Sequence, residues 1–473
     1  MILTDLYKDS SFLKDLSDHL DAAKARVHVD GLTGSLPAVA IAALALRRPT
    51  VNQLVIAPSK EEAYYLQNDI EALLQNLPAS GGNPGNPENG FDKISQDFDG
   101  PDKSWKSKEN LQDLQDLAQR ENKVMLFPTS YRKAYHYDPE QTENANLLMR
   151  NEVTKALSGS EPLIVVSYAD ALSEKVVSSN TFRANTFRIA RGQKLDMWEA
   201  VERLQEMGFE REDFVVEPGQ YAVRGGIVDV YSYASDLPFR IEFFDDEVDS
   251  LRTYDTVTQL SVKQMDRIDI VPNFQNLPAS GGNPGNPENG FDKISQDFDG
   301  PDKSWKSKEN LQDLQDLAQR ERRVSLMEYF GADDIVWTQS LMMTAEQMEK
   351  LLADTRKAYS DRLADKEHPI AGSLPKPEEM NCSANEFLHK LLDCKIVEYG
   401  NSHYFSQADR IEHHSDPQPA FNKQFDLLTA NLADYADRGY HILLTVSNDS
   451  QENRLKKILD ESDDNHFQFS IFN

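Results

Sequence analysis

The stretch Phe239–Phe244 constrains the fold of this chain most strongly, because every second residue in it is large and apolar. Successive residues of a β-strand point to opposite faces of the sheet, so residues 239, 241 and 243 share a core face. The opposite face carries Arg240, Glu242 and Phe244. Residues 226–231 show a similar alternation, and turn-forming residues at 235–238 separate the two segments. Together they predict a β-hairpin with one buried face.

Arg224 lies just before this hairpin, next to the pair Gly225-Gly226. A glycine pair suits a β-bulge, which would re-aim the arginine side chain. Two interpretations of the polar face are open. It is either an ordinary solvated face, as charged residues mostly are, or a contact surface built on two arginines and an aromatic, the residue types of protein–protein hot spots.

A helix is predicted just upstream, where apolar residues recur at every third position from 195 to 207 and Gly208 stops the pattern. Strands are predicted after the hairpin at residues 248–255 and 268–271. A helix packed on one face of an antiparallel sheet leaves the other face free. Arg240 and Phe244 would lie on that free face, roughly 13 Å apart along the strand.

The first part of the chain alternates apolar segments with helical patterns, which predicts a parallel, doubly wound α/β sheet. Strands are predicted at residues 54–57, 124–127 and 163–167. Helices are predicted after Ser59, whose spacing to a glutamate three residues later is that of a capping box, and at residues 144–157.

An aromatic run follows the second of these strands and contains Tyr131, Tyr135 and Tyr137. Tyrosines in such a run can stack on bases, as they do on surfaces that bind single strands. Because tyrosine is commonly part-buried, we interpret the three side chains as packing residues.

Residues 31–38 contain two glycines and lie where a doubly wound sheet would normally have its nucleotide-binding turn. A phosphate-binding loop needs a glycine at its close approach, a lysine for the phosphates and a Ser or Thr hydroxyl for magnesium. Here those positions are Leu36, Pro37 and Ala38. We interpret the stretch as a degenerate nucleotide loop with a structural role, and we expect no cofactor. Its residues are Gly31, Gly34, Ser35, Leu36, Pro37 and Ala38.

Three segments, VEPGQYA, RGGIVDVY and LPFRIEFFDDEVDSLRTYD, resemble the bacterial transcription-repair coupling factors (Mfd proteins). They are similar to domain 2 of that family and to the matching domain of the excision-repair protein UvrB. The resemblance implies that the domain docks the repair protein UvrA through Arg224, Arg240 and Phe244. It also implies an inactive nucleotide loop and the absence of the damage-probing hairpin of UvrB.

The resemblance further implies a domain organisation. The expected parts are a degenerate RecA/P-loop-like domain at 1–180, an inserted α+β UvrA-docking domain at 181–273, a return to the first domain at 274–367, and a small α/β domain at 368–473. In the family, the modules that bind RNA polymerase and translocate on DNA lie beyond these parts. The chain is therefore expected to be a fragment without catalysis of its own.

The elements expected in the second half follow from local patterns. Strands at residues 324–329 and 335–337 would return to the first sheet, and a helix would follow at 344–365. The last domain would hold helices at 383–392, 426–438 and 451–459 and strands at 395–399 and 442–446. The neighbouring histidines His413 and His414 lack a second cluster at metal-ligand spacing, so no metal site is expected.

Residues 75–121 recur without a change at 275–321. Structural repeats drift in sequence and occur in arrays of three or more. The first half of each copy is rich in Gly, Pro and Asn, which is typical of irregular linkers. A duplicated insertion, or an error in the recorded sequence, explains the identity better than function does. A partner-binding motif around Trp105 and Trp305 is the minor alternative.

Composition limits the function classes. The formal net charge of −29 disfavours a nonspecific DNA binder, which needs clustered cations. Two cysteines and an amino terminus without a secretion signal predict a soluble cytoplasmic protein with no membrane contact. The alternatives to a docking function are a superfamily 2 DNA-dependent ATPase and a UvrB-like DNA-binding module.

Overall fold

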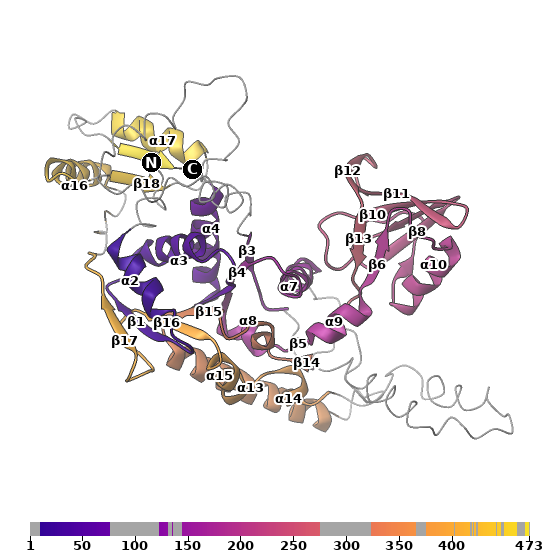
Figure 1. Cartoon of the computed structure of the whole chain (residues 1–473), viewed down its shortest axis with the longest axis horizontal. Helices are drawn as coiled ribbons and strands as arrows, with labels where there is room; N and C mark the ends of the chain where they lie inside the picture. The colour runs from indigo at the N-terminus through magenta and orange to yellow at the C-terminus, as the bar shows by residue number, and fades with distance from the viewer. Residues whose placement is uncertain are drawn as a thin grey trace. The chain divides into compact units, whose positions relative to one another are not determined.

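The computed structural model contains a mainly parallel sheet and a separate β-rich domain, each accompanied by helices (Figure 1). It describes residues 10–75, 123–130, 135, 144–274, 323–365, 375–401, 403–416, 419, 421, 424–440, 442–445, 449–460 and 469–472. Both identical segments, with Trp105 and Trp305, lie outside these residues apart from the last residue of one helix. The prediction about them therefore stays untested.

The larger sheet has seven strands in the hydrogen-bonded order β17-β1-β16-β15-β2-β4-β3. Its strands are β1 (Arg26–Asp30), β2 (Gln53–Ala57), β3 (Lys123–Leu126), β4 (Leu163–Tyr168), β15 (Ile335–Thr338), β16 (Lys395–Tyr399) and β17 (Asp409–Glu412). The pairs β1–β17, β16–β15, β15–β2 and β2–β4 are parallel. Every residue of β2, β4, β15 and β16 is buried, as parallel strands covered on both faces require.

Helices account for most of the remaining described residues outside the β-rich domain. They are α2 (Ser11–His19), α3 (Leu36–Arg47), α4 (Lys60–Gln75), α7 (Asn144–Leu157), α8 (Ala169–Ser173), α9 (Ser179–Asn185), α13 (Leu341–Ala364), α14 (Pro377–Met380), α15 (Ala384–Leu391), α16 (Phe425–Asp437) and α17 (Asp449–Asp460). The Ser59 hydroxyl accepts the Glu62 N–H at 3.2 Å, which confirms the predicted cap of α4. No helix among the described residues is long and apolar enough to cross a bilayer.

By internal contacts the chain divides into two compact units. Unit 1 takes residues 1–51, 65–124 and 399–473, and unit 2 takes residues 52–64 and 125–398. Unit 2 also holds the short pair of β5 (Val176–Val177) with β14 (Arg323–Val324). Unit 1 ends in the parallel pair of β18 (Ile442–Thr445) with β19 (Phe469–Phe472), and Leu432, Ala433 and Leu459 pack against Ile442.

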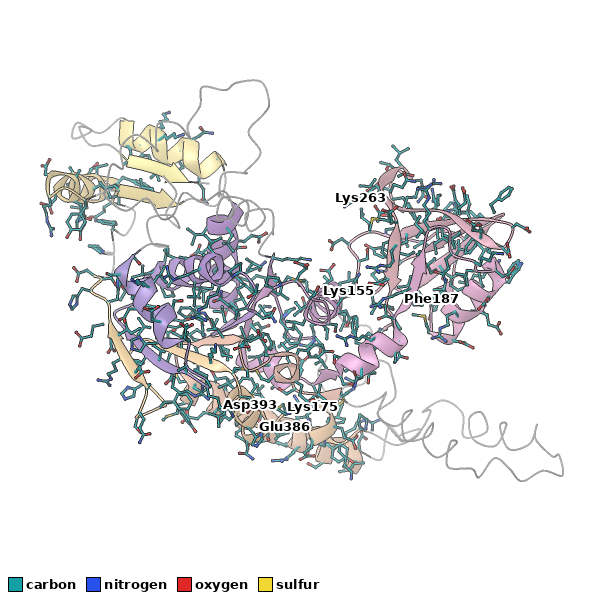
Figure 2. All side chains as sticks on the ribbon, viewed as in Figure 1. Lys155, Lys175, Phe187, Lys263, Glu386 and Asp393 are labelled. Carbon is teal, nitrogen blue, oxygen red and sulfur yellow. The ribbon has the colours of Figure 1, made fainter. Side chains whose placement is uncertain are left out.

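The β-rich domain is a six-stranded sheet in the order β12-β11-β10-β9-β8-β7. Its strands are β7 (Glu210–Arg211), β8 (Gln220–Arg224), β9 (Ile227–Val230), β10 (Phe239–Phe244), β11 (Glu247–Tyr254) and β12 (Ser261–Met265). Neighbouring strands from β8 to β12 are antiparallel. A side ribbon pairs β6 (Phe187–Ala190) with β13 (Arg267–Ile270), and Figure 2 labels Phe187 on β6 and Lys263 on β12.

One face of this sheet and helix α10 (Met197–Glu206) share a hydrophobic core. Ala200, Val201 and Leu204 of the helix pack with Val228 and Ile241 of the sheet, all of them buried. The Asp196 carboxylate caps the helix by accepting the N–H groups of Trp198 and Glu199. With this face covered, the opposite face of the hairpin strands carries the polar side chains, as predicted.

Several expected elements need correction. Residues 326–329 form a 3₁₀ turn (Leu326–Tyr329) and not a strand, because Ser325 caps the turn by accepting the Met327 N–H. The pair Gly225-Gly226 is the turn between β8 and β9, with Gly225 at φ +60°, and not a bulge. The register shift lies instead between Glu242 and Phe243.

One strand expected in the last domain, at residues 395–399, is β16, which pairs with β15 inside unit 2. Strand β17, which the sequence patterns did not predict, pairs with β1 inside unit 1. Parallel pairing joins segments far apart in the chain, so a local pattern does not show it. Residues 395–399 are therefore a strand of the seven-stranded sheet.

Candidate functional site

The polar face of the β-rich domain brings together the three residues that the resemblance assigns to docking. We call it the arginine face and define it by Arg224, Asp229, Arg240, Glu242 and Phe244. Strand register explains why they meet: Asp229 lies opposite Arg240 on β10 and opposite Ala222 on β8, two residues from Arg224. The face therefore runs across three neighbouring strands.

Asp229 is the centre of the arginine face and is completely buried. Its Oδ1 accepts Arg240 Nε at 2.7 Å, and its Oδ2 accepts Arg240 Nη2 at 2.9 Å. Oδ2 also accepts Arg224 Nη2. Two guanidinium groups share one carboxylate, which leaves one positive charge in excess at this cluster.

Arg240 makes several contacts within its own domain besides those with Asp229. Its guanidinium carbon lies 4.1 Å from the ring centroid of Tyr254, and Nη2 donates to Gln259 Oε1 at 3.1 Å. The side chain is only 14% exposed. The pKa of Arg240 is raised, first because Asp229 accepts its hydrogen bonds, so the group stays cationic.

Arg224 is the more accessible of the two arginines, with 39% of its side chain exposed. Its guanidinium carbon lies 5.1 Å from the ring centroid of Phe214, which is itself 59% exposed. This arrangement presents a cation and an aromatic ring side by side.

Glu242 and Arg252 form a second ion pair on the same face. Arg252 Nη1 donates to Glu242 Oε2 at 3.2 Å, and the Ser250 hydroxyl donates to the same oxygen at 2.6 Å. The pKa of Glu242 is lowered, mainly by the Ser250 hydrogen bond and then by Arg252. This pair is neutral, so the excess charge stays at Arg224 and Arg240.

Phe244 ends β10 and is 78% exposed. The next residue, Asp245, has φ +57°, and the chain turns there into β11. An exposed phenylalanine at a tight turn gains nothing from the core. Its exposure on the same strand face as Arg240 suits a contact residue.

Sequence reasoning missed Asp229, Tyr254 and Gln259 as parts of this face. Asp229 could have been found, because it alternates with Val228 and Val230 and so shares a face with Arg240 in the hairpin. Tyr254 and Gln259 contact Arg240 from β11 and from the turn after it. No local sequence pattern predicts these two contacts.

The degenerate loop joins β1 to α3 in unit 1. Gly31 has φ +86°, and an added Cβ would collide with the backbone carbonyl of His413. The Ser415 hydroxyl donates to the Gly31 carbonyl, and its oxygen lies 2.8 Å from the Thr33 hydroxyl. Residues 413–415 therefore pack directly on the loop.

The start of α3 lacks the lysine and the hydroxyl with which an active loop holds phosphates and magnesium. Leu36 N–H donates to the Thr33 carbonyl at 3.2 Å, and Pro37 in the first turn has no N–H. Ala38 is buried and has no hydroxyl for magnesium.

One residue of the aromatic run, Tyr135, lies outside any site. Tyr135 donates to the Pro375 carbonyl at 2.8 Å and its ring lies 5.2 Å from that of Tyr359, as a packing residue does. Tyr131 and Tyr137 lie outside the described residues. Among the described part of the chain, no group of three His, Cys, Asp or Glu side chains is placed to hold a metal.

Residues 187–275 match the UvrB interaction domain family. Relatives named transcription-repair-coupling factor include that of Bacillus subtilis (strain 168), 35% identical over 26% of this chain and 10% of the relative, and that of Escherichia coli (strain K12), 30% identical over 23% and 10%. The relative in Staphylococcus aureus (strain bovine RF122 / ET3-1) is 22% identical over 65% of this chain and 27% of its own length. The expected resemblance to the amino-terminal module of this family is confirmed. The matches span about a quarter or less of each relative.

Proposed function

We propose that this chain, which carries a UvrB interaction domain at residues 187–275, recruits UvrA to stalled transcription complexes through the arginine face. The observation that supports the proposal best is the composition of that face. One excess positive charge and the exposed Phe244 share the sheet face that α10 leaves free.

The physical chemistry of the face suits a protein partner. Buried aromatic and arginine contacts supply most of the binding energy at interfaces. Arg224 can add a charge-assisted hydrogen bond to a carboxylate of UvrA, while Phe214 and Phe244 supply apolar area. The partner surface would therefore combine an acidic side chain with an apolar depression.

The recruitment would take place in the cytoplasm and would need no catalysis by the described residues. RNA polymerase and DNA would be engaged by other modules of a coupling factor. An ATPase alternative would need a phosphate-binding loop, and residues 31–38 lack both its lysine and its magnesium ligand. A DNA-binding alternative would need a local basic patch, whereas the arginine face has one excess charge.

Calorimetric titration of UvrA into the chain tests the proposal. Wild-type chain should bind, and Arg224→Ala should weaken binding by about 2 kcal/mol, as removal of a hot-spot arginine does. Arg188→Ala is the matched control, because Arg188 is 61% exposed on β6 of the same domain and also forms an ion pair, with Asp269. Equal losses for both variants, or no binding by the wild type, would reject the proposal.

A further inference from the structure

The carboxylate of Asp229 is fully buried and receives three N–H donors from two arginines on flanking strands. A buried carboxylate is unfavourable unless it is paired and hydrogen-bonded. Here its pairing also fixes the distance between the two guanidinium groups. Asp229 therefore acts on both arginines at once.

The two arginines differ in what they have left to offer a partner. Arg240 donates through Nε and Nη2 to Asp229 and through Nη2 to Gln259, and its plane lies against Tyr254. A guanidinium group recognises a carboxylate best through two parallel N–H groups. The Nε and Nη2 edge of Arg240 is already used in this way by Asp229.

Arg224 makes fewer contacts within the domain than Arg240 and is more exposed. It meets Asp229 through Nη2, lies against Phe214 and keeps 39% of its side chain exposed. It is therefore the arginine placed to touch a partner, and Asp229 determines where its guanidinium group points.

We infer that Asp229 is a positioning residue of the arginine face: clamped by Arg240, it aims Arg224 at an acidic side chain of the partner. This inference rests on the proposed function. It gives Arg240 an indirect role, since Arg240 holds Asp229 and does not itself pair with the partner carboxylate.

For one variant, the inference predicts a change in binding affinity opposite to the change that charge attraction alone predicts. Asp229→Asn keeps the shape of the side chain and raises the net charge of the face by one. If attraction by positive charge alone governed binding, the variant would bind an acidic partner more tightly. If positioning governs binding, the variant binds more weakly, because neither arginine keeps its orientation.

The experiment is calorimetric titration of UvrA into wild-type chain, Asp229→Asn and Asp269→Asn, each checked by thermal unfolding. Asp269→Asn is the matched control, because it removes the charge of a carboxylate that is paired with an arginine, Arg188, in the same domain but outside the arginine face. We expect at least tenfold weaker binding for Asp229→Asn and less than a twofold change for Asp269→Asn. Unchanged or tighter binding by a folded Asp229→Asn overturns the inference.

A second variant covers the case in which Asp229→Asn does not fold. Arg240→Lys keeps the positive charge but cannot hold both oxygens of Asp229 in parallel. We expect at least tenfold weaker binding from it as well, and wild-type affinity would overturn the inference. If wild-type chain fails to bind UvrA, the proposed function itself fails and the inference falls with it, whereas wild-type binding with unaffected variants rejects the inference alone.

Discussion

At the scale of single residues, the arginine face is a set of charges whose neighbours determine their role. Arg240 and Arg252 are direct cross-strand partners, an arrangement that is unfavourable for like charges. Asp229 compensates the first and Glu242 the second. The face therefore holds one carboxylate on β9 that two arginines share and one carboxylate on β10 that pairs with a single arginine, and only the shared carboxylate leaves an excess positive charge.

The Glu242 ion pair predicts a pH dependence of stability. The pKa of Glu242 is below its ordinary 4.5 in the folded chain, so the ionised carboxylate stabilises the fold above about that pH, and the effect is lost as pH falls through the lowered pKa. Glu242→Gln should lower the free energy of unfolding by about 0.2–1 kcal/mol at pH 7. Denaturation at pH 7 and pH 3 checks this, and a difference that persists undiminished at pH 3 would contradict it.

Gly208 and Gly219 differ in their surroundings, and this difference predicts different stability costs for alanine at the two positions. Gly208 and Gly219 both have positive φ, +80° and +93°, but an added Cβ at Gly208 meets open space whereas at Gly219 it collides with the Tyr233 ring. Gly208→Ala should cost about 1 kcal/mol from backbone strain. Gly219→Ala should cost about 1–3 kcal/mol more, since Tyr233 must move. Equal melting temperatures for the two variants would show that the ring is not held there.

At the scale of elements, patterns within one segment were predictive and pairings between distant segments were not. The alternation in Phe239–Phe244 predicted the strand, its core face and its polar face. Nothing local to residues 395–399 indicates that they pair with Ile335–Thr338. The charge cluster followed the same rule, because Asp229 was readable from the hairpin alternation and Gln259 was not.

Helix α10 shows where a pattern misleads. Apolar residues at every third position drift around a helix of 3.6 residues per turn, by roughly 60° at each step. Val201 and Leu204 consequently reach the core, while Trp198 is 59% exposed. Leu195, which is also in the core, precedes the helix. The three-residue spacing therefore predicts the helix but not which of its apolar side chains are buried.

This difference predicts the stability of two variants. Leu204→Ala should cost about 2–5 kcal/mol, because the side chain is fully buried in the domain core. Trp198→Ala should change stability by less than about 0.5 kcal/mol, as surface substitutions do. Thermal unfolding of both variants decides between this packing and one in which the tryptophan is a core residue.

At the scale of the whole molecule, the net charge of −29 and the degenerate loop both support a docking protein. An acidic chain repels nucleic acid except at local sites. The packing of residues 413–415 on the loop gives Gly31 a structural role, because an added Cβ would collide with the His413 carbonyl.

The loop geometry predicts that the chain does not bind ATP. Equilibrium dialysis with ATP and magnesium should show no retained nucleotide at concentrations where an active phosphate-binding loop is saturated. Bound nucleotide that Gly31→Ala abolishes would contradict the structural role of residues 31–38.

The most direct test of the docking surface compares two exposed aromatic residues of one domain. Phe244 lies on the arginine face and Trp198 lies on α10, with 78% and 59% of each residue exposed. UvrA should bind Phe244→Ala more weakly than wild type by more than about 2 kcal/mol, and Trp198→Ala with wild-type affinity. Wild-type affinity in Phe244→Ala, or an equal loss in both variants, would contradict the assignment of docking to the arginine face.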